Sequence, residues 1–202
     1  MTRIHAIFIL VVLWIAWCFL HSLLISRGFA ERMKGILGRK YAYYRLCYVI
    51  FSFVSLLPVI CFQLQLDEKV IFAWPPPWYI VKYALYAAAI ILFYGGYRVY
   101  DLQYMLGIKQ IDDMKHGVNN KTTDFTTEGI LGYVRHPWYS GAILLVWGFG
   151  VVSDVSLVSK VVLTAYIILG TVLEEKKLIH EIGAPYRMYQ KKVPMLIPWK
   201  KG

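Results

Sequence analysis

An arginine, a histidine and a proline stand side by side where a polar stretch of the chain meets an apolar one. They belong to T-E-G-I-L-G-Y-V-R-H-P-W-Y, residues 127–139. Proline suits the first turn of a helix, because the N–H it lacks would have no partner there, so Pro137 predicts a helix start. Arg135 and His136 then lie beside free backbone N–H groups and the positive end of the helix dipole, which attract anions. Polar groups at this depth of a membrane indicate a functional site.

Two adjacent glutamates, Glu174 and Glu175, lie near the far end of the next apolar segment. If the two segments form an antiparallel hairpin that turns near Asp154, Pro137 lies 17 residues before the turn and Glu174 lies 20 after it. The difference corresponds to about 4.5 Å of helix, less than one turn. The hairpin therefore predicts that both motifs share one depth.

The residues after Gly183 predict a short amphipathic helix that begins near Pro185 and carries Tyr186, Arg187 and Tyr189. This helix would return over the two motifs. Carboxylates, an arginine–histidine pair and several aromatic rings are thus predicted to converge on one cytoplasmic pocket.

The composition indicates an all-α integral membrane protein. Of 202 residues, 58% are hydrophobic and 16% aromatic, which is too apolar for a soluble domain of this size. The formal charge of +10 is explained by membrane topology. No basic stretch belongs to a soluble fold, so the charge does not predict binding to nucleic acid. The three cysteines lie in apolar runs and form no disulfide or zinc pattern. The length predicts one domain, residues 1–202.

Five transmembrane helices are expected, since a span needs roughly 20 apolar residues. They cover residues 4–26, 41–64, 78 to about 100, 137–152 and 155 to about 178. A cleaved signal peptide is the competing interpretation of the first, but that run is long and lacks a small-x-small site. Residues 1–126 would hold helices one to three and a polar loop (101–128), and residues 127–198 the cofactor-binding core, with the tail as an interfacial segment anchored by Trp199.

Basic residues concentrate on one side of this topology, which places the N-terminus outside and the C-terminus in the cytoplasm of a cell (inner) membrane. The link 27–40, the loop before Arg135 and the C-terminal region hold most of the lysines and arginines. A formal glycosylation sequon, Asn120-Lys121-Thr122, falls on the cytoplasmic side and is discounted.

The motifs resemble those of the isoprenylcysteine carboxyl methyltransferase and phospholipid methyltransferase superfamily. The resemblance rests on R-H-P-x-Y, on E-E about 40 residues later, and on Y-R-x-Y followed by V-P-x-x-x-P. F-L-H-S-L-L-I-S at 19–26 and Y-D-L-Q-Y-M-L-G-I-K-Q at 100–110 resemble the NnrU-type branch that includes methanethiol S-methyltransferase. Where the family often has an aromatic and a basic residue, this chain has Leu131 and Gly132.

The resemblance implies S-adenosyl-L-methionine as the cofactor. It places this cofactor among residues that the motifs supply: Gly129, Tyr133, His136, Pro137, Tyr139, Glu174, Glu175, Tyr186 and Tyr189. Aromatic faces attract a sulfonium cation, and a carboxylate accepts hydrogen bonds from ribose hydroxyls or an ammonium.

The expected reaction is methyl transfer to a small or lipophilic acceptor, with a thiol favoured. A thiolate is the nucleophile, and a guanidinium lowers a thiol's pKa, so Arg135 is the candidate stabiliser of an anionic acceptor, with His21 or Asp101 accepting the proton. Carboxyl methylation of a prenylated cysteine, in which Arg187 would bind the carboxylate, and N-methylation of a phospholipid headgroup are the alternatives. A non-catalytic assembly or regulatory protein of the same fold is the rival of another class.

Each residue also has a structural interpretation. Arg135 can anchor a helix at lipid phosphates, the glutamates can form a solvated helix end, and the tyrosines can be interfacial aromatics. His21 can be a packed histidine and Asp101 a helix cap. The glycines at 95, 96, 148 and 150 indicate close helix packing.

Overall fold

The computed structural model describes residues 2–117 and 125–198 as an all-α membrane protein. Four described helical stretches are long and apolar enough to cross a bilayer: α1 (Arg3–Ile25), the stretch Arg27–Leu64 that ends in α3, α4 (Tyr79–Val99) and α8 (Asp154–Ile182). The discounted sequon at 120–122 and the predicted anchor Trp199 lie outside the described residues.

The chain divides into two compact units, each formed by two separate stretches. Unit 1 comprises Met1–Glu68 and Asp101–Thr122, and unit 2 comprises Lys69–Tyr100 and Thr123–Gly202. The motifs at 127–139 and 174–198 therefore belong to unit 2.

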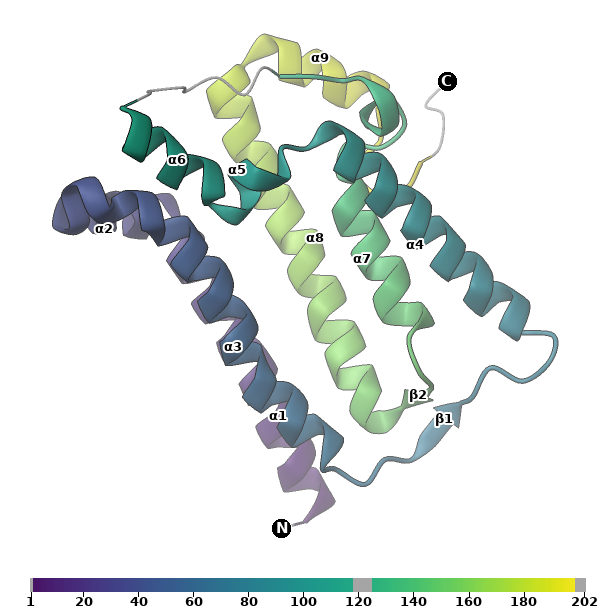
Figure 1. Cartoon of the computed structure of the whole chain (residues 1–202). Coiled ribbons are helices and arrows are strands. Elements are labelled where there is room, and N and C mark those ends of the chain that lie inside the picture. Colours follow the sequence, from purple (N-terminus) through teal and green to yellow (C-terminus); the bar gives the residue numbers. More distant parts are fainter. Residues whose placement is uncertain (1, 118–124, 199–202) are drawn as a thin grey trace. The chain divides into compact units, whose positions relative to one another are not determined.

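In unit 1, α1 lies beside α3 (Tyr44–Leu64) (Figure 1). Two indole side chains of α1 join these helices. The Trp14 Nε1–H donates to Gln63 Oε1 over 2.9 Å, and the Trp17 Nε1–H donates to the Ser52 carbonyl over 3.2 Å. Both indoles thus have a polar partner inside an apolar helix pair, where an unpaired N–H would be costly.

The basic link between the first two spans is helical. It forms α2 (Arg27–Leu37) and the 3₁₀ helix η1 (Gly38–Tyr43). Ser26, in extended backbone, separates α1 from α2, and its hydroxyl accepts a hydrogen bond from the Phe29 N–H at the start of α2. A side-chain oxygen at this position satisfies a free N–H of the first turn.

The predicted polar loop 101–128 contains two short helices, α5 (Leu102–Leu106) and α6 (Ile108–His116). Gly107 joins them with φ +87°, and a Cβ at this position would lie 2.6 Å from the Leu46 backbone nitrogen. Only glycine fits such a left-handed, tightly packed position.

In unit 2, α7 (Pro137–Gly148) packs closely on α4. A Cβ at Gly96 would lie 2.2 Å from Trp138 Nε1, and this indole N–H donates to the Phe93 carbonyl over 3.0 Å. The expected packing role holds for glycines 95, 96 and 148 but is wrong for Gly150, which has open space around it and φ +62°. Gly150 instead serves the turn after α7.

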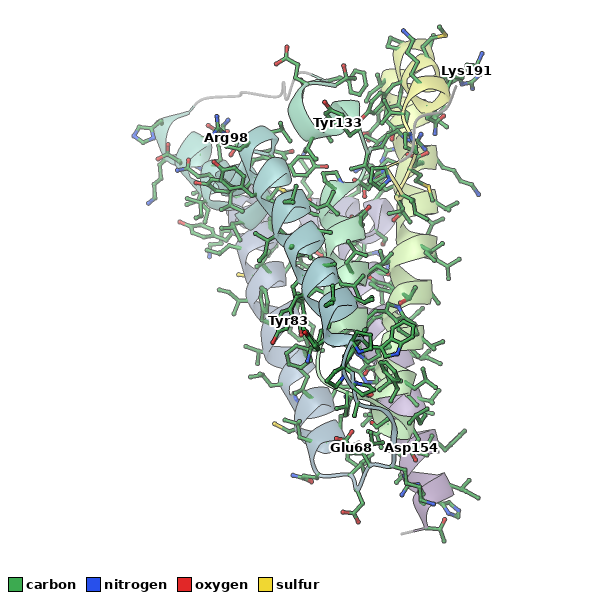
Figure 2. All side chains as sticks on the ribbon, turned by 90° about the vertical axis from the view of Figure 1, so that its right-hand side faces the viewer. Glu68, Tyr83, Arg98, Tyr133, Asp154 and Lys191 are labelled. Carbon is green, nitrogen blue, oxygen red and sulfur yellow. The ribbon has the colours of Figure 1, made fainter. Side chains whose placement is uncertain are left out.

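At the opposite end of unit 2 from the motifs, β1 (Val70–Phe72) pairs antiparallel with β2 (Val152–Ser153). Asp154 Oδ1 accepts from the Lys69 N–H over 2.9 Å, and the Ser153 hydroxyl caps α8 by accepting from the Ser156 N–H. Figure 2 shows Asp154 at this end of the unit and Tyr133 and Lys191 at the other.

Lys160 of α8 is buried beside the C-terminal end of α7. Its ammonium donates to the carbonyls of Val146 over 2.6 Å and Phe149 over 2.8 Å. The last carbonyls of a helix have no partner within it, so this lysine caps α7 from a neighbouring helix.

Gly183, with φ +77°, ends α8, and α9 (Ala184–Lys192) follows with a proline in its first turn. The 3₁₀ helix η2 (Gly129–Gly132) precedes α7. These turns bring the motifs of the C-terminal half to one end of unit 2.

Candidate functional site

The backbone before α7 is held by the C-terminal tail, residues 193–198. His136 is the N-cap residue and Pro137 lies in the first turn of α7. The N–H groups of Arg135 and His136 donate to the carbonyls of Pro194 and Met195 over 3.0 and 3.2 Å. The tail thus occupies the N–H of the N-cap residue, one of the donors that would otherwise favour an anion at this helix start, and the N–H before it.

Arg135 and Glu175 form a buried, two-pronged ion pair. Arg135 Nε lies 2.6 Å from Glu175 Oε1, and Nη2 lies 2.7 Å from Oε2. The two residues are 8% and 7% exposed. A planar guanidinium matches a carboxylate in this geometry, and burial removes the competing water.

Three further donors bind the same carboxylate. Glu175 Oε1 also accepts from His136 Nε2 and from the Tyr186 hydroxyl, each over 2.9 Å. Oε2 also accepts from Gln190 Nε2 over 2.6 Å. With five donors on two oxygens, the hydrogen-bonding capacity of Glu175 is filled by the protein itself.

The guanidinium of Arg135 is engaged in the same way. Besides the ion pair, its Nη1 donates to the carbonyls of Gln190, over 3.2 Å, and Val193. The Ser140 hydroxyl donates to the Leu196 carbonyl over 2.6 Å. These bonds fix the tail across the start of α7, and we call the set of Arg135, His136, Glu175, Tyr186 and Gln190 the clamp.

Two tyrosines of α9 lie in the core rather than on its surface. Tyr186 and Tyr189 are 2% and 7% exposed, and the ring of Phe125 packs edge-on against both. Burial raises the pKa of Tyr189 to about 12, and its hydroxyl donates to the Leu131 carbonyl over 2.6 Å. Burial and the Glu175 carboxylate raise the pKa of Tyr186. Both hydroxyls therefore stay protonated as donors.

Glu174 has a different environment from its neighbour. It is partly exposed and accepts a hydrogen bond from the Tyr139 hydroxyl over 2.7 Å. The Tyr139 ring stacks on His136, with centroids 5.6 Å apart. Burial, followed by the charge of Glu174, raises the pKa of Tyr100, so its phenol stays neutral. A carboxylate with remaining acceptor capacity thus lies next to aromatic rings.

The remaining predicted residues of this unit lie nearer the surface. Tyr133 is 70% exposed, and Arg187 is exposed on α9 between the buried tyrosines. Gly129 begins η2 with φ +59°, a conformation that favours glycine. The structure therefore brings His136, Pro137 and Tyr139 together with both glutamates and Tyr186, whereas Tyr133 and Arg187 face outward.

His21 and Asp101 belong to unit 1. His21 Nε2 lies 2.7 Å from the Tyr48 hydroxyl, and its ring packs against Trp17. Asp101 caps α5 by accepting from the Tyr104 N–H, and a hydrogen bond from Lys109 lowers the pKa of its carboxyl. This arrangement favours the capping role of Asp101, because a carboxylate with a lowered pKa is a weaker base.

Sequence reasoning missed Gln190, Ser140 and Lys160. The V-P-x-x-x-P pattern marked the tail, but nothing marked its carbonyls as partners of Arg135 and Ser140. Gln190 directly follows the Y-R-x-Y motif, and this position was the available signal for it.

The sequence matches one family model and is similar to several proteins that share one name. A model of the family described as "Protein of unknown function (DUF1295)" matches residues 2–193. Methanethiol S-methyltransferase 1 of Bradyrhizobium diazoefficiens is 31% identical over 160 residues, which cover 78% of this chain and 55% of that protein. Methanethiol S-methyltransferase of Pseudomonas deceptionensis is 28% identical over 185 residues, or 88% and 67%. The protein of that name from Mycobacterium tuberculosis is 27% identical over 95 residues, or 47% and 39%. The match thus spans about half the length of the first of these relatives. No solved structure matches the chain.

Proposed function

The chain belongs to the DUF1295 family, within the isoprenylcysteine and methanethiol methyltransferase-like superfamily, and on that premise we propose that it is an S-adenosylmethionine-dependent methyltransferase of the membrane that methylates a thiol. The observation that carries this proposal is the convergence of the R-H-P-x-Y and E-E motifs. The hydrogen-bonding capacity of Glu175 is filled by the other residues of the clamp, whereas Glu174 can still accept hydrogen bonds. The names of the relatives support the thiol as the methyl acceptor.

The residues around Glu174 fit a positively charged cofactor. S-adenosylmethionine, when bound, supplies an electrophilic methyl group on a sulfonium. Glu174 would accept hydrogen bonds from an ammonium or a hydroxyl of the cofactor, and the rings of Tyr139 and His136 would pack against its cationic or planar parts. Gly129, Tyr133, Pro137 and Tyr189 remain members of the proposed cofactor-binding set.

The clamp has a positioning role in this proposal. Arg135 and Glu175 neutralise each other, and Arg135 also bonds to the tail at Val193, so we assign the pair to holding His136 and Tyr139 in place rather than to binding an acceptor. A 1 Å displacement of positioned groups is enough to cost about 100-fold in rate, which explains why a methyltransferase would maintain such a connection.

The acceptor thiol must lose its proton before it attacks. His21, which contacts the Tyr48 hydroxyl, and Asp101, which is paired with Lys109, remain the proposed proton acceptors. Arg187, exposed on α9, is the cation proposed to attract an anionic acceptor.

We also propose five membrane spans in one methyltransferase domain, residues 1–202. The span added to the four long helical stretches is α7, the fourth in chain order. Its 12 residues measure about 18 Å, less than the about 30 Å of hydrocarbon, so it would cross together with its flanking segments as one arm of a hairpin with α8. The N-terminus would lie outside and the C-terminus, with α9 over the cofactor site, in the cytoplasm of a cell (inner) membrane.

Binding and labelling test the proposal. S-adenosylmethionine should release heat and raise the melting temperature when added to the detergent-purified full chain. No heat and no shift at millimolar cofactor would favour a non-catalytic assembly protein.

The acceptor is then identified with cofactor labelled in its methyl group. We expect label in dimethyl sulfide when methanethiol is offered. Label in farnesyl-cysteine or in phosphatidylethanolamine instead would assign carboxyl methylation or headgroup N-methylation.

A further inference from the structure

The helix that links the first two spans has two chemically distinct sides. Four apolar residues of α2 recur at intervals of three and four, which places them on one face: Phe29, Met33, Ile36 and Leu37. Arg27 and Glu31 lie on the other side. The structure describes all of α2, and none of its residues is buried. Ile36 is 71% exposed, whereas Phe29, Met33 and Leu37 are partly buried, so the apolar face of α2 is open at Ile36.

The position of α2 in the chain places it at a membrane surface. α1 has 23 residues and rises about 35 Å, slightly more than the about 30 Å of hydrocarbon, so Ile25 reaches the interface. Ser26 alone separates α1 from α2, and its extended backbone turns the chain. In Figure 1, α2 runs across the end of α3 instead of along it. α2 therefore lies along the surface that α1 has just reached.

The charges of this link match an anionic surface. Residues 27–40 contain five cations, Arg27, Arg32, Lys34, Arg39 and Lys40, against the single carboxylate of Glu31. Arg32 lies one turn before Ile36, and Lys34 three residues before Leu37, so the two cations flank both borders of the apolar face. Long basic side chains at such borders reach from the acyl boundary to the phosphates.

We propose that α2 is an interfacial helix that binds anionic phospholipid headgroups through Arg32 and Lys34 while its apolar face enters the acyl boundary. If a second copy of the chain or another protein covered this face, the cations at both of its borders would have no explanation. This proposal does not depend on the methyltransferase assignment.

Spin labels test the position of the apolar face. The labelled sites are Ile36→Cys and, as the matched control on the opposite side of α2, Glu31→Cys, in a full chain whose three native cysteines are replaced by alanine and which is reconstituted in bilayers. We expect molecular oxygen to reach the label at 36 and a water-soluble nickel reagent to reach the label at 31. A label at 36 that is reached by neither, or by the nickel reagent, would overturn the proposal, because protein or water would then cover this face.

Lipid binding tests the headgroup contact. Short-chain phosphatidylglycerol, short-chain phosphatidylcholine and inorganic phosphate are each titrated into the detergent-purified chain, with the melting temperature as the readout. Phosphatidylglycerol should bind best, and the double variant Arg32→Gln/Lys34→Gln should weaken its binding about 25-fold, at about fivefold per cation. The control Lys191→Gln/Lys192→Gln removes the same charge from α9. Equal losses in both variants, or equal effects of phosphate and phosphatidylglycerol, would contradict a headgroup site on α2.

Discussion

Arg135 and Glu175, 40 positions apart in the sequence, face each other in the interior of unit 2, with Nε 2.6 Å from Oε1 and Nη2 2.7 Å from Oε2. The ion pair connects the residues before α7 with the end of α8. Because Arg135 also bonds to the carbonyls of Gln190 and Val193, it connects both with the tail. The first four predictions below depend on this connection or on the groups around it, and the fifth concerns the opposite end of α7.

The ion pair should behave as one unit when it is mutated. Glu175→Gln leaves the buried guanidinium without its counter-charge, so we expect the free energy of unfolding to fall by about 3–5 kcal/mol. Arg135→Gln should cost a similar amount, and the double variant should be less destabilised than the sum of the two. Denaturant titration in detergent measures all three. Strictly additive losses would mean that the two charges do not interact.

The neighbouring carboxylate should behave differently. Glu174 is partly exposed and bonded to Tyr139, so Glu174→Gln should leave the melting temperature nearly unchanged. Losing a charge-assisted hydrogen bond of about 1.5–3 kcal/mol should weaken binding of S-adenosylmethionine about 10–100-fold. Calorimetry measures the affinity, and Glu181→Gln on the exposed end of α8 is the control. Wild-type affinity in Glu174→Gln would remove this residue from the cofactor site.

Alkaline pH should loosen α9. The pKa of Tyr189 is raised to about 12 in the folded protein, against about 10 in the unfolded chain, so the folded state disfavours the phenolate. This contribution to stability is complete below pH 10 and is lost as the pH rises toward 12, because the unfolded state releases its proton first. The free energy of unfolding is measured between pH 9 and 12, and tyrosinate absorbance reports the loss of the proton. With rising pH this free energy should fall less steeply in Tyr189→Phe than in the wild type, by up to about 1.4 kcal/mol per pH unit. The same slope in both proteins would contradict the burial of this hydroxyl.

A charge at position 190 should make the clamp sensitive to acid. The Gln190 amide donates to Glu175 Oε2, so Gln190→Glu places a second carboxylate against the first. We expect a lower melting temperature than in Gln190→Leu at pH 7, and a difference that shrinks as the pH approaches about 4–5, where a carboxyl gains a proton. A pH-independent difference would show that the side chain of residue 190 does not face Glu175.

Lys160 should contribute to stability without affecting the site. Lys160→Met keeps the length of the side chain but leaves the carbonyls of Val146 and Phe149 without their donor. We expect unfolding to become easier by about 1–3 kcal/mol while cofactor affinity stays constant. Lys82→Met, which changes a partly exposed lysine of α4, is the control. Equal stability of the two variants would argue against the capping of α7.

Much of the helical framework follows from local sequence. Runs of roughly 20 apolar residues predict helices because a bilayer leaves no other partner for the backbone. The expected starts at residues 4, 78 and 155 lie one residue from those of α1, α4 and α8. Pro137 and Gly183 also mark the start of α7 and the end of α8, since both act through their own backbone conformations.

The choice between the two glutamates was decided only by the tertiary structure. Consecutive residues of an α-helix point about 100° apart, so rotation of α8 about its axis turns Glu175 into the clamp and leaves Glu174 at its edge. Local sequence contains no measure of that rotation, because it depends on how α8 packs against α7 and α9. Gln190 and Lys160 show the same limit. The partner of Gln190 is 15 residues away and the partners of Lys160 are at most 14 residues away, yet packing alone selects them. The sequence by itself thus determined the helices and the types of group that meet, and the tertiary structure decided which of these groups bind each other and which keep capacity for a ligand.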